Sequence, residues 1–157
     1  PENYEARAEI MWCGSLSHNG LTGCGTCGGD WATHLMEHEL GGMFDVAHGA
    51  GLAAVWGSWA RYVMDEKPER FAQFAVDVMG VEESDDVKST ALKGIEAVEE
   101  FYRMIEMPTN MKELGINPTD EQIKDMAMKA TNHDTQQLGA FKKLSAKDLV
   151  EIYKTAK

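Results

Sequence analysis

Residues 34–48 read HLMEHELGGMFDVAH, and they hold three of the five histidines of this 157-residue chain. A helix makes one turn every 3.6 residues, so a helix here places His34 and His38 on the same face, one turn apart. The glycine pair 41–42 is expected to end that helix, and the chain can then fold back to bring His48 toward the pair. Neutral imidazole binds Zn²⁺ and Fe²⁺ alike, so the segment predicts a metal site. A histidine pair at this spacing can also be an ordinary hydrogen-bonded pair.

The rest of the chain has the apolar spacing of helices, and no run alternates convincingly as a strand would. We expect helices over 3–18, from Trp31 to about Leu40, from near His48 to about Asp65, from Pro68 onward, and from Ser84 to about Ile105. Asp30 can cap the histidine helix. Two capping boxes, Thr119 with Gln122 and Ser145 with Asp148, are expected to start two more helices. The fold class is therefore predicted to be all-α, with residues 1–157 forming a single domain.

Composition and charge exclude several function classes. The hydrophobic content of 43% is that of a globular protein, and the net charge of −11 disfavours nucleic acid as a partner. The most apolar stretch, residues 49–64, is glycine-rich and contains Arg61, so we expect no membrane span. Three cysteines are too few for a disulfide framework and favour a reducing cytoplasm. The chain starts without methionine, and we expect it to be a piece of a longer protein.

Two other metal motifs deserve comparison. The letters of 34–38 match the H-x-x-E-H pattern of inverted zinc peptidases, in which Glu37 would be the general base and a later glutamate (Glu96, Glu99 or Glu100) the third ligand. This alternative leaves His48 and Gly49 unexplained. Cys24 and Cys27 form a C-x-x-C, but only six residues separate Cys27 from His34, against about twelve in zinc fingers. We expect these cysteines to be small residues in a glycine-rich loop, 21–30.

The complete pattern H-x3-H-x9-H-G, formed by His34, His38, His48 and Gly49, resembles the signature of the iron-containing (group III) alcohol dehydrogenases. The surrounding segment 28–63 is similar to the NAD(P)H-dependent butanol dehydrogenase branch. The opening PENYEARAEIMWCGSLSHNG and the closing KKLSAKDLVEIYKTA also resemble that branch, so the resemblance covers nearly all of the chain.

The resemblance implies a fold, a site and a reaction. The fold would be the helical C-terminal domain of a dehydroquinate synthase-like, iron alcohol dehydrogenase fold. His34 and His48 would be metal ligands, and His38 a proton relay or an orienting residue. The metal would be Fe²⁺, with Zn²⁺ possible, and hydride would pass between a primary alcohol or aldehyde and NAD(H) or NADP(H). The full-length enzyme would be a homo-oligomer, a dimer, and Glu37 would become a supporting or surface residue.

The same resemblance implies that this chain is only part of such an enzyme. An N-terminal α/β domain would bind the nucleotide, and an upstream aspartate and histidine would complete the metal site. No strand, glycine loop and helix of that kind occurs in this sequence. We therefore expect the isolated chain to bind metal poorly and to lack dehydrogenase activity. The alternative without an activity of its own is a helical module with an exposed apolar surface.

Overall fold

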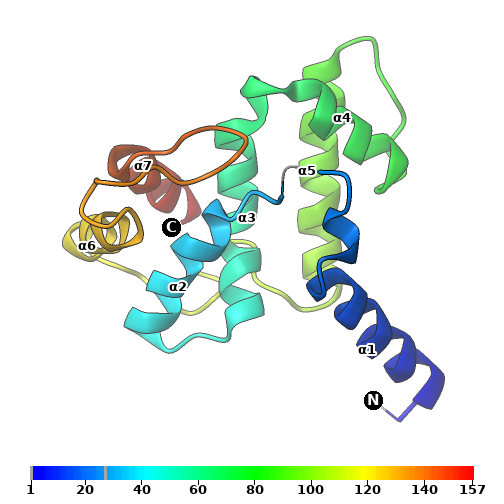
Figure 1. The fold of residues 1–157 in the computed structure, drawn as a ribbon, viewed down its shortest axis with the longest axis horizontal. Helices are drawn as coiled ribbons and strands as arrows, with labels where there is room; N and C mark the ends of the chain where they lie inside the picture. Colours follow the sequence, from blue (N-terminus) through cyan, green and yellow to red (C-terminus); the bar gives the residue numbers. More distant parts are fainter. Residues whose placement is uncertain (1, 27) are drawn as a thin grey trace.

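Helices account for all the regular structure of the described part of the chain. A computed structural model describes residues 2–26 and 28–157 (Figure 1). The α-helices are α1 (Tyr4–His18), α2 (Ala32–Phe44), α3 (His48–Val63), α4 (Pro68–Asp77), α5 (Val87–Met104), α6 (Asp120–Ala130) and α7 (Ala146–Ala156), and the 3₁₀ turns are η1 (Leu21–Gly23) and η2 (Met64–Glu66). Extended pairing in these ranges is limited to one isolated bridge between Leu138 and Leu144. The all-α prediction is confirmed.

Several helix starts follow the predicted capping chemistry. Both capping boxes form: the side chains of Thr119 and Ser145 accept from the third helical N–H, and the residue at that position bonds back. Asp30 Oδ1 accepts from the Ala32 N–H at 2.9 Å. Its other oxygen accepts from the backbone N–H groups of residues 140 and 141, at 2.7 and 2.8 Å. Asp30 thus holds the start of α2 against the loop before α7.

The predicted helix break at Gly41 and Gly42 is wrong. Helix α2 continues through both glycines to Phe44, and the Asp45 N–H still bonds to the Gly41 carbonyl at 2.9 Å. The helix ends where Asp45 adopts a left-handed conformation with φ of 53°, which aspartate tolerates better than most residues. Glycine costs a helix only about 1 kcal/mol, so packing can retain it there.

The core lies between α2, α3, α6 and α7. Their buried side chains form one cluster, to which α4 and α5 contribute at the edge of α3. Tyr153 of α7 is completely buried, and its hydroxyl donates to the Met36 carbonyl of α2 at 2.7 Å. Burial raises the pKa of Tyr153 well above its ordinary value. The hydrogen bond from Tyr153 anchors α7 to α2, the helix that bears His34 and His38.

Helices α4 and α5 cross very closely. A Cβ placed on Gly94 of α5 would lie 2.4 Å from the Cβ of Ala75 in α4, so only glycine permits this crossing. The pair is fixed to α3 by Arg61, whose Nη2 donates to Glu99 of α5 at 2.9 Å. These contacts explain why α4 and α5 stand together beside the core in Figure 1.

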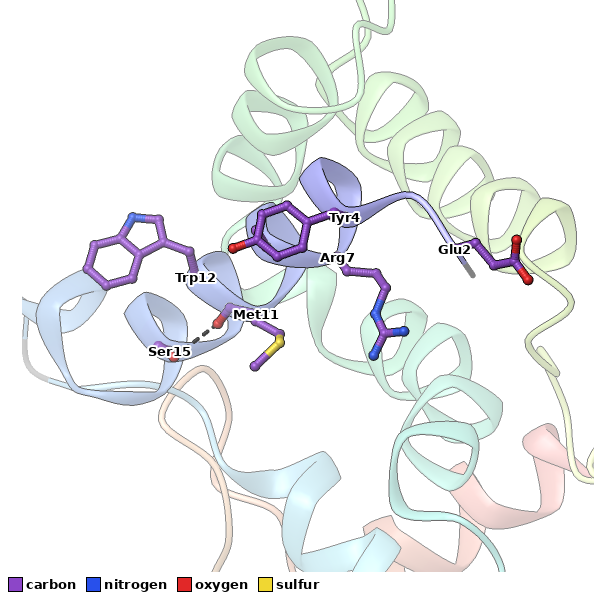
Figure 2. Close-up of a pocket in the computed structure, with 7 residues that line it drawn as sticks. Glu2, Tyr4, Arg7, Met11, Trp12 and Ser15 are labelled. Carbon is purple, nitrogen blue, oxygen red and sulfur yellow. Dashed lines mark hydrogen bonds between the residues drawn. The ribbon is translucent and has the colours of Figure 1, made fainter.

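Helix α1 lies at one side of the molecule, away from α2, α6 and α7 (Figure 1), and contributes no buried residue. Tyr4, Ile10, Met11 and Trp12 are 62–78% exposed. A hollow of about 640 Å³ runs along this helix, and Figure 2 shows Tyr4, Met11 and Trp12 among its lining side chains.

Within the described residues, no helix is long and apolar enough to cross a membrane.

Candidate metal centre

The turn between α2 and α3 brings two of the three predicted site histidines together. His34 lies in the first turn of α2, and His48 is the first residue of α3. Their Nε2 atoms are 3.3 Å apart, and their ring centroids are 4.9 Å apart. Residues fourteen positions apart therefore present the same ring nitrogen to one point.

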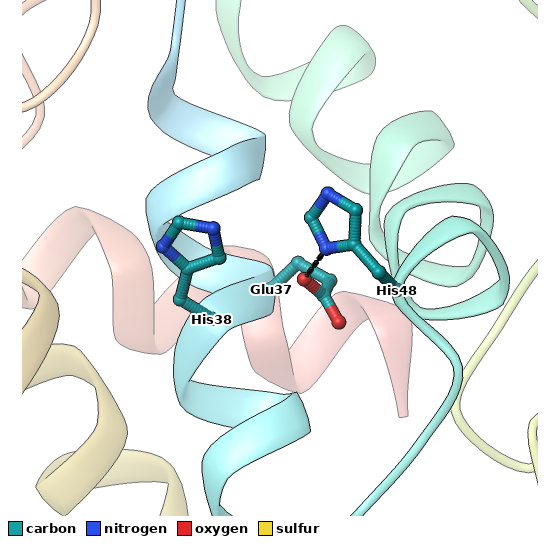
Figure 3. A group of neighbouring side chains, drawn as sticks. All are labelled: Glu37, His38 and His48. Atoms are coloured by element: carbon teal, nitrogen blue, oxygen red, sulfur yellow. Dashed lines mark hydrogen bonds and ion pairs between the residues drawn. The ribbon is translucent and has the colours of Figure 1, made fainter.

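Glu37 supports this arrangement through a bond to His48. Its side chain is only 2% exposed, and its carboxylate accepts a hydrogen bond from Nδ1 of His48, as Figure 3 shows. A carboxylate on Nδ1 assigns the proton to that nitrogen, so Nε2 of His48 carries the free lone pair. Histidines that bind metals usually have such a partner on the other ring nitrogen. Two roles were expected for Glu37, a supporting residue or a surface residue. Its burial and its bond to His48 favour the supporting role.

Two glycines make room for the Glu37 side chain. A Cβ on Gly51 of α3 would lie 2.7 Å from both Cγ and Oε1 of Glu37. A Cβ on Gly41 would lie 3.3 Å from the same oxygen. A side chain at position 41 would crowd Glu37 at this distance, so close packing favours glycine inside α2 here. The small residues of HGAG (48–51) are the feature of the sequence from which this space around the Glu37 side chain, the Glu37 cradle, could have been predicted.

His38 is exposed, as His48 is, and its ring stands beside those of His34 and His48. Its ring centroid is 5.6 Å from that of His48 and 6.0 Å from that of His34. Glu37, His38 and His48 also offer one ligand atom each within 4.8 Å of one another. We prefer the pairing of His34 with His48, because the Glu37 carboxylate is already bonded to His48 Nδ1 and is buried beneath the rings.

The surroundings of His34 favour its neutral form. Partial burial lowers the pKa of His34, and the adjacent His48 and His38 lower it further. A neutral imidazole has the lone pair that a metal requires. The Trp31 ring stands 4.9 Å from the His34 ring, centroid to centroid, and shields one side of it.

The residues present fit a metal ion. An ion bound by two nitrogens at about 2.1 Å holds them about 3.0–3.4 Å apart for angles between octahedral and tetrahedral. The measured Nε2 separation of 3.3 Å lies within that range. Two imidazole nitrogens suit Fe²⁺ or Zn²⁺ but leave the coordination incomplete.

The peptidase alternative does not agree with this geometry. A general base must reach a solvent-accessible water, whereas Glu37 is buried and bonded to His48. Of the glutamates considered as a third ligand, Glu99 is held by Arg61.

Among the cysteines, Cys24 is exposed in the loop after α1, and Cys27 lies outside the described residues.

The fold is thus a helical domain in which two imidazoles converge and a carboxylate stands behind one of them, an arrangement that could hold a metal ion. Residues 1–157 match the Fe-containing alcohol dehydrogenase family, C-terminal. The chain therefore belongs to the iron-containing alcohol dehydrogenase family, as the histidine pattern predicted.

Individual relatives agree with this assignment. The chain is 36% identical over 156 residues to the probable NADH-dependent butanol dehydrogenase 1 of Bacillus subtilis, covering 99% of this chain and 39% of the relative. It is 32% identical to the NADPH-dependent aldehyde reductase YqhD of Escherichia coli, of which it covers 40%. The crystal structure of NADH-dependent butanol dehydrogenase A from Thermotoga maritima superimposes with a TM-score of 0.88 at 34% identity, over 99% of this chain and 40% of that chain. The chain thus spans about two fifths of the length of these relatives.

Proposed function

We propose that this chain is the C-terminal, metal-binding part of an enzyme that interconverts primary alcohols and aldehydes with NAD(H) or NADP(H). Family membership and similarity to butanol dehydrogenases and an aldehyde reductase support the reaction class. The observation that carries the site is the 3.3 Å approach of the His34 and His48 Nε2 atoms. We assign these two atoms as ligands of Fe²⁺, with Zn²⁺ as the alternative.

A bound divalent ion would supply Lewis acidity at the alcohol or aldehyde oxygen. The residues of this chain have separate tasks around that ion. His34 and His48 hold it through Nε2, and Glu37 fixes the tautomer and orientation of His48 through Nδ1. His38 is exposed and its ring is centred within 6.0 Å of both ligand rings, so it can pass a proton between the site and solvent.

The exposed surface of α1 supports the proposal that a further domain belongs to the enzyme. A solitary helix with four large apolar side chains more than 60% exposed is unusual in a folded monomer. We propose that a nucleotide-binding domain covers this surface and supplies the remaining ligands. The isolated chain should then self-associate through α1, which light scattering and binding of a hydrophobic dye would report. A monomer that binds no dye would contradict this part of the proposal.

The reaction is tested by a chimaera. The matching segment of the Bacillus subtilis relative is replaced by this chain, and butanol-dependent NADH formation and bound metal are measured. His34→Ala and His48→Ala should lose both metal and activity, whereas His38→Gln should keep the metal and lose about 10²-fold in rate. His133→Asn is the control, because His133 is exposed and asparagine tolerates its positive φ.

Two outcomes would contradict these assignments. Full activity and metal content in His48→Ala would remove His48 from the ligand set. Metal loss in His38→Gln equal to that in His34→Ala would make His38 a ligand. The isolated chain should reduce neither NAD⁺ nor NADP⁺ with butanol, and robust activity of the chain alone would refute the need for a further domain.

A further inference from the structure

Trp31 stands directly before α2 and beside the candidate metal centre. Its ring centroid lies 4.9 Å from that of His34, and the two ring planes meet at 71°. Such an edge-to-face contact is a favourable arrangement for two aromatic rings. His34 in turn brings its Nε2 within 3.3 Å of the Nε2 of His48. The indole therefore packs against one of the two proposed ligand rings.

The Trp31 side chain is not required to start the helix or to fill the core. It makes no capping hydrogen bond at α2, where Asp30 accepts from the Ala32 N–H instead. Trp31 is not part of the buried core cluster, and it is 56% exposed. Its Nε1 end lies over Gly29, where an added Cβ would be 3.6 Å away. The indole is thus held between the preceding loop and His34, with more than half of its surface open.

Helical geometry places Trp31 and His34 on one face of α2. The Leu35 N–H bonds to the Trp31 carbonyl at 3.0 Å, so the helical hydrogen bonds begin at Trp31. Positions three apart differ by about 60° around the axis, whereas Leu35, which follows His34 directly, points about 100° away from it. His38 lies one turn beyond His34, on the side away from Trp31. The face that bears His34 therefore has an indole at one end and an imidazole at the other.

We propose that Trp31 is a specificity-determining residue, whose indole is the wall against which the alkyl chain of a primary alcohol or aldehyde packs. This inference rests on the proposed dehydrogenase function. An alcohol whose oxygen lies beside the two Nε2 atoms can reach the indole with a chain of a few carbons, since each extended carbon adds about 1.3 Å. Because His38 occupies the other end of the face, the hydroxyl proton and the alkyl chain have separate neighbours.

Contact with the indole should make the enzyme prefer longer chains. A fully buried methylene improves binding by about 4-fold, and a wall on one side of the chain should give about half of that free energy, or about 2-fold for each carbon. Between ethanol and 1-hexanol, Trp31 should therefore raise kcat/KM by roughly 10–20-fold.

The chimaera with the Bacillus subtilis relative measures this preference. The ratio of kcat/KM for 1-hexanol to that for ethanol should fall about 10-fold in Trp31→Ala, and Trp31→Phe, which keeps a ring, should restore most of it. Leu35→Ala is the matched control, because Leu35 is an apolar side chain of the same helix, 38% exposed, that points away from His34. It should change the ratio by less than about 2-fold. Bound metal is measured in each variant to verify that the centre is intact.

A second readout needs no turnover. The chimaera is labelled with 5-fluorotryptophan and loaded with Zn²⁺ but not with nucleotide, so no hydride can be transferred. The fluorine NMR signal that is missing from Trp31→Phe belongs to Trp31. This signal should shift saturably with 1-hexanol below about 20 mM, whereas ethanol should bind about 10-fold more weakly or less.

Two results would overturn the inference. Equal losses of kcat/KM for ethanol and 1-hexanol in Trp31→Ala would show that the indole only supports His34. A Trp31 signal unmoved by about 20 mM 1-hexanol would show that the further domain, and not the alkyl chain, covers the indole. A chimaera that binds metal but oxidises no alcohol would contradict the proposed function, and the 1-hexanol titration would still decide whether Trp31 contacts the chain.

Discussion

The cradle around Glu37 makes a quantitative prediction for Gly51→Ala. Alanine is favoured over glycine inside a helix by about 1 kcal/mol. The added methyl group would stand 2.7 Å from Cγ and Oε1 of Glu37, whereas nonbonded carbons rest about 3.5–4.0 Å apart. Glu37 would have to move by about 1 Å although it is 2% exposed. The contact therefore outweighs the gain in helix propensity.

The expected magnitude has two parts. Overpacking costs about 1–3 kcal/mol, and disturbing the buried bond between Glu37 and His48 costs about 1–3 kcal/mol more. After the helix gain of about 1 kcal/mol is subtracted, Gly51→Ala should destabilise the fold by roughly 1–5 kcal/mol. Gly49→Ala is the matched control on the same helix, because its added methyl meets nothing within 4 Å. It should be neutral or slightly stabilising.

Urea unfolding followed by far-UV circular dichroism measures both variants, with the denaturant slope verifying that the unfolded states are comparable. The cause is isolated in a Glu37→Ala background. There the space is vacated, so Gly51→Ala should lose most of its cost, giving a coupling energy about as large as that cost. A Gly51→Ala variant as stable as Gly49→Ala would refute the cradle, and so would an equal cost with and without Glu37.

Three further perturbations follow from the geometry. Gly94→Ala should destabilise by about 1–3 kcal/mol in urea unfolding, because its methyl would meet an α4 Cβ at 2.4 Å, whereas Gly14→Ala, which meets nothing, should not. Glu37→Gln should weaken metal binding by the chimaera about 10-fold or more in a competition titration with a chelator, and an unchanged affinity would remove Glu37 from its supporting role. Burial raises the pKa of Asp148, but hydrogen bonds from Ser145 and Tyr62 outweigh this effect and leave the pKa lowered. The ionised Asp148 carboxylate therefore stabilises the fold above about pH 4, and this stabilisation is lost as the pH falls further. Unfolding free energies should therefore fall less steeply below about pH 4 in Asp148→Asn, and equal slopes would contradict this.

Local signals in the sequence predicted most helices and their starts. Apolar spacing located the helices, and both capping boxes form because their hydrogen bonds involve residues only three positions apart. The one helix boundary predicted wrongly, at Gly41, fails for a nonlocal reason. The low helix propensity of glycine indicated a break, but close packing against Glu37 favours glycine at this position.

The sequence by itself determined the all-α class, the family, and the set of histidines that form the candidate site, because helical periodicity and motif spacing are properties of neighbouring residues. Only the tertiary structure decided what those residues do to one another. His48 meets His34 and Glu37 across a turn between two helices, and Gly51 shapes the space for Glu37 from the opposite helix. The aromatic hollow beside α3 and α4 likewise joins segments up to 85 residues apart, from Trp56 to Phe141. Such contacts depend on how the helices cross, and no local pattern in the chain encodes that crossing.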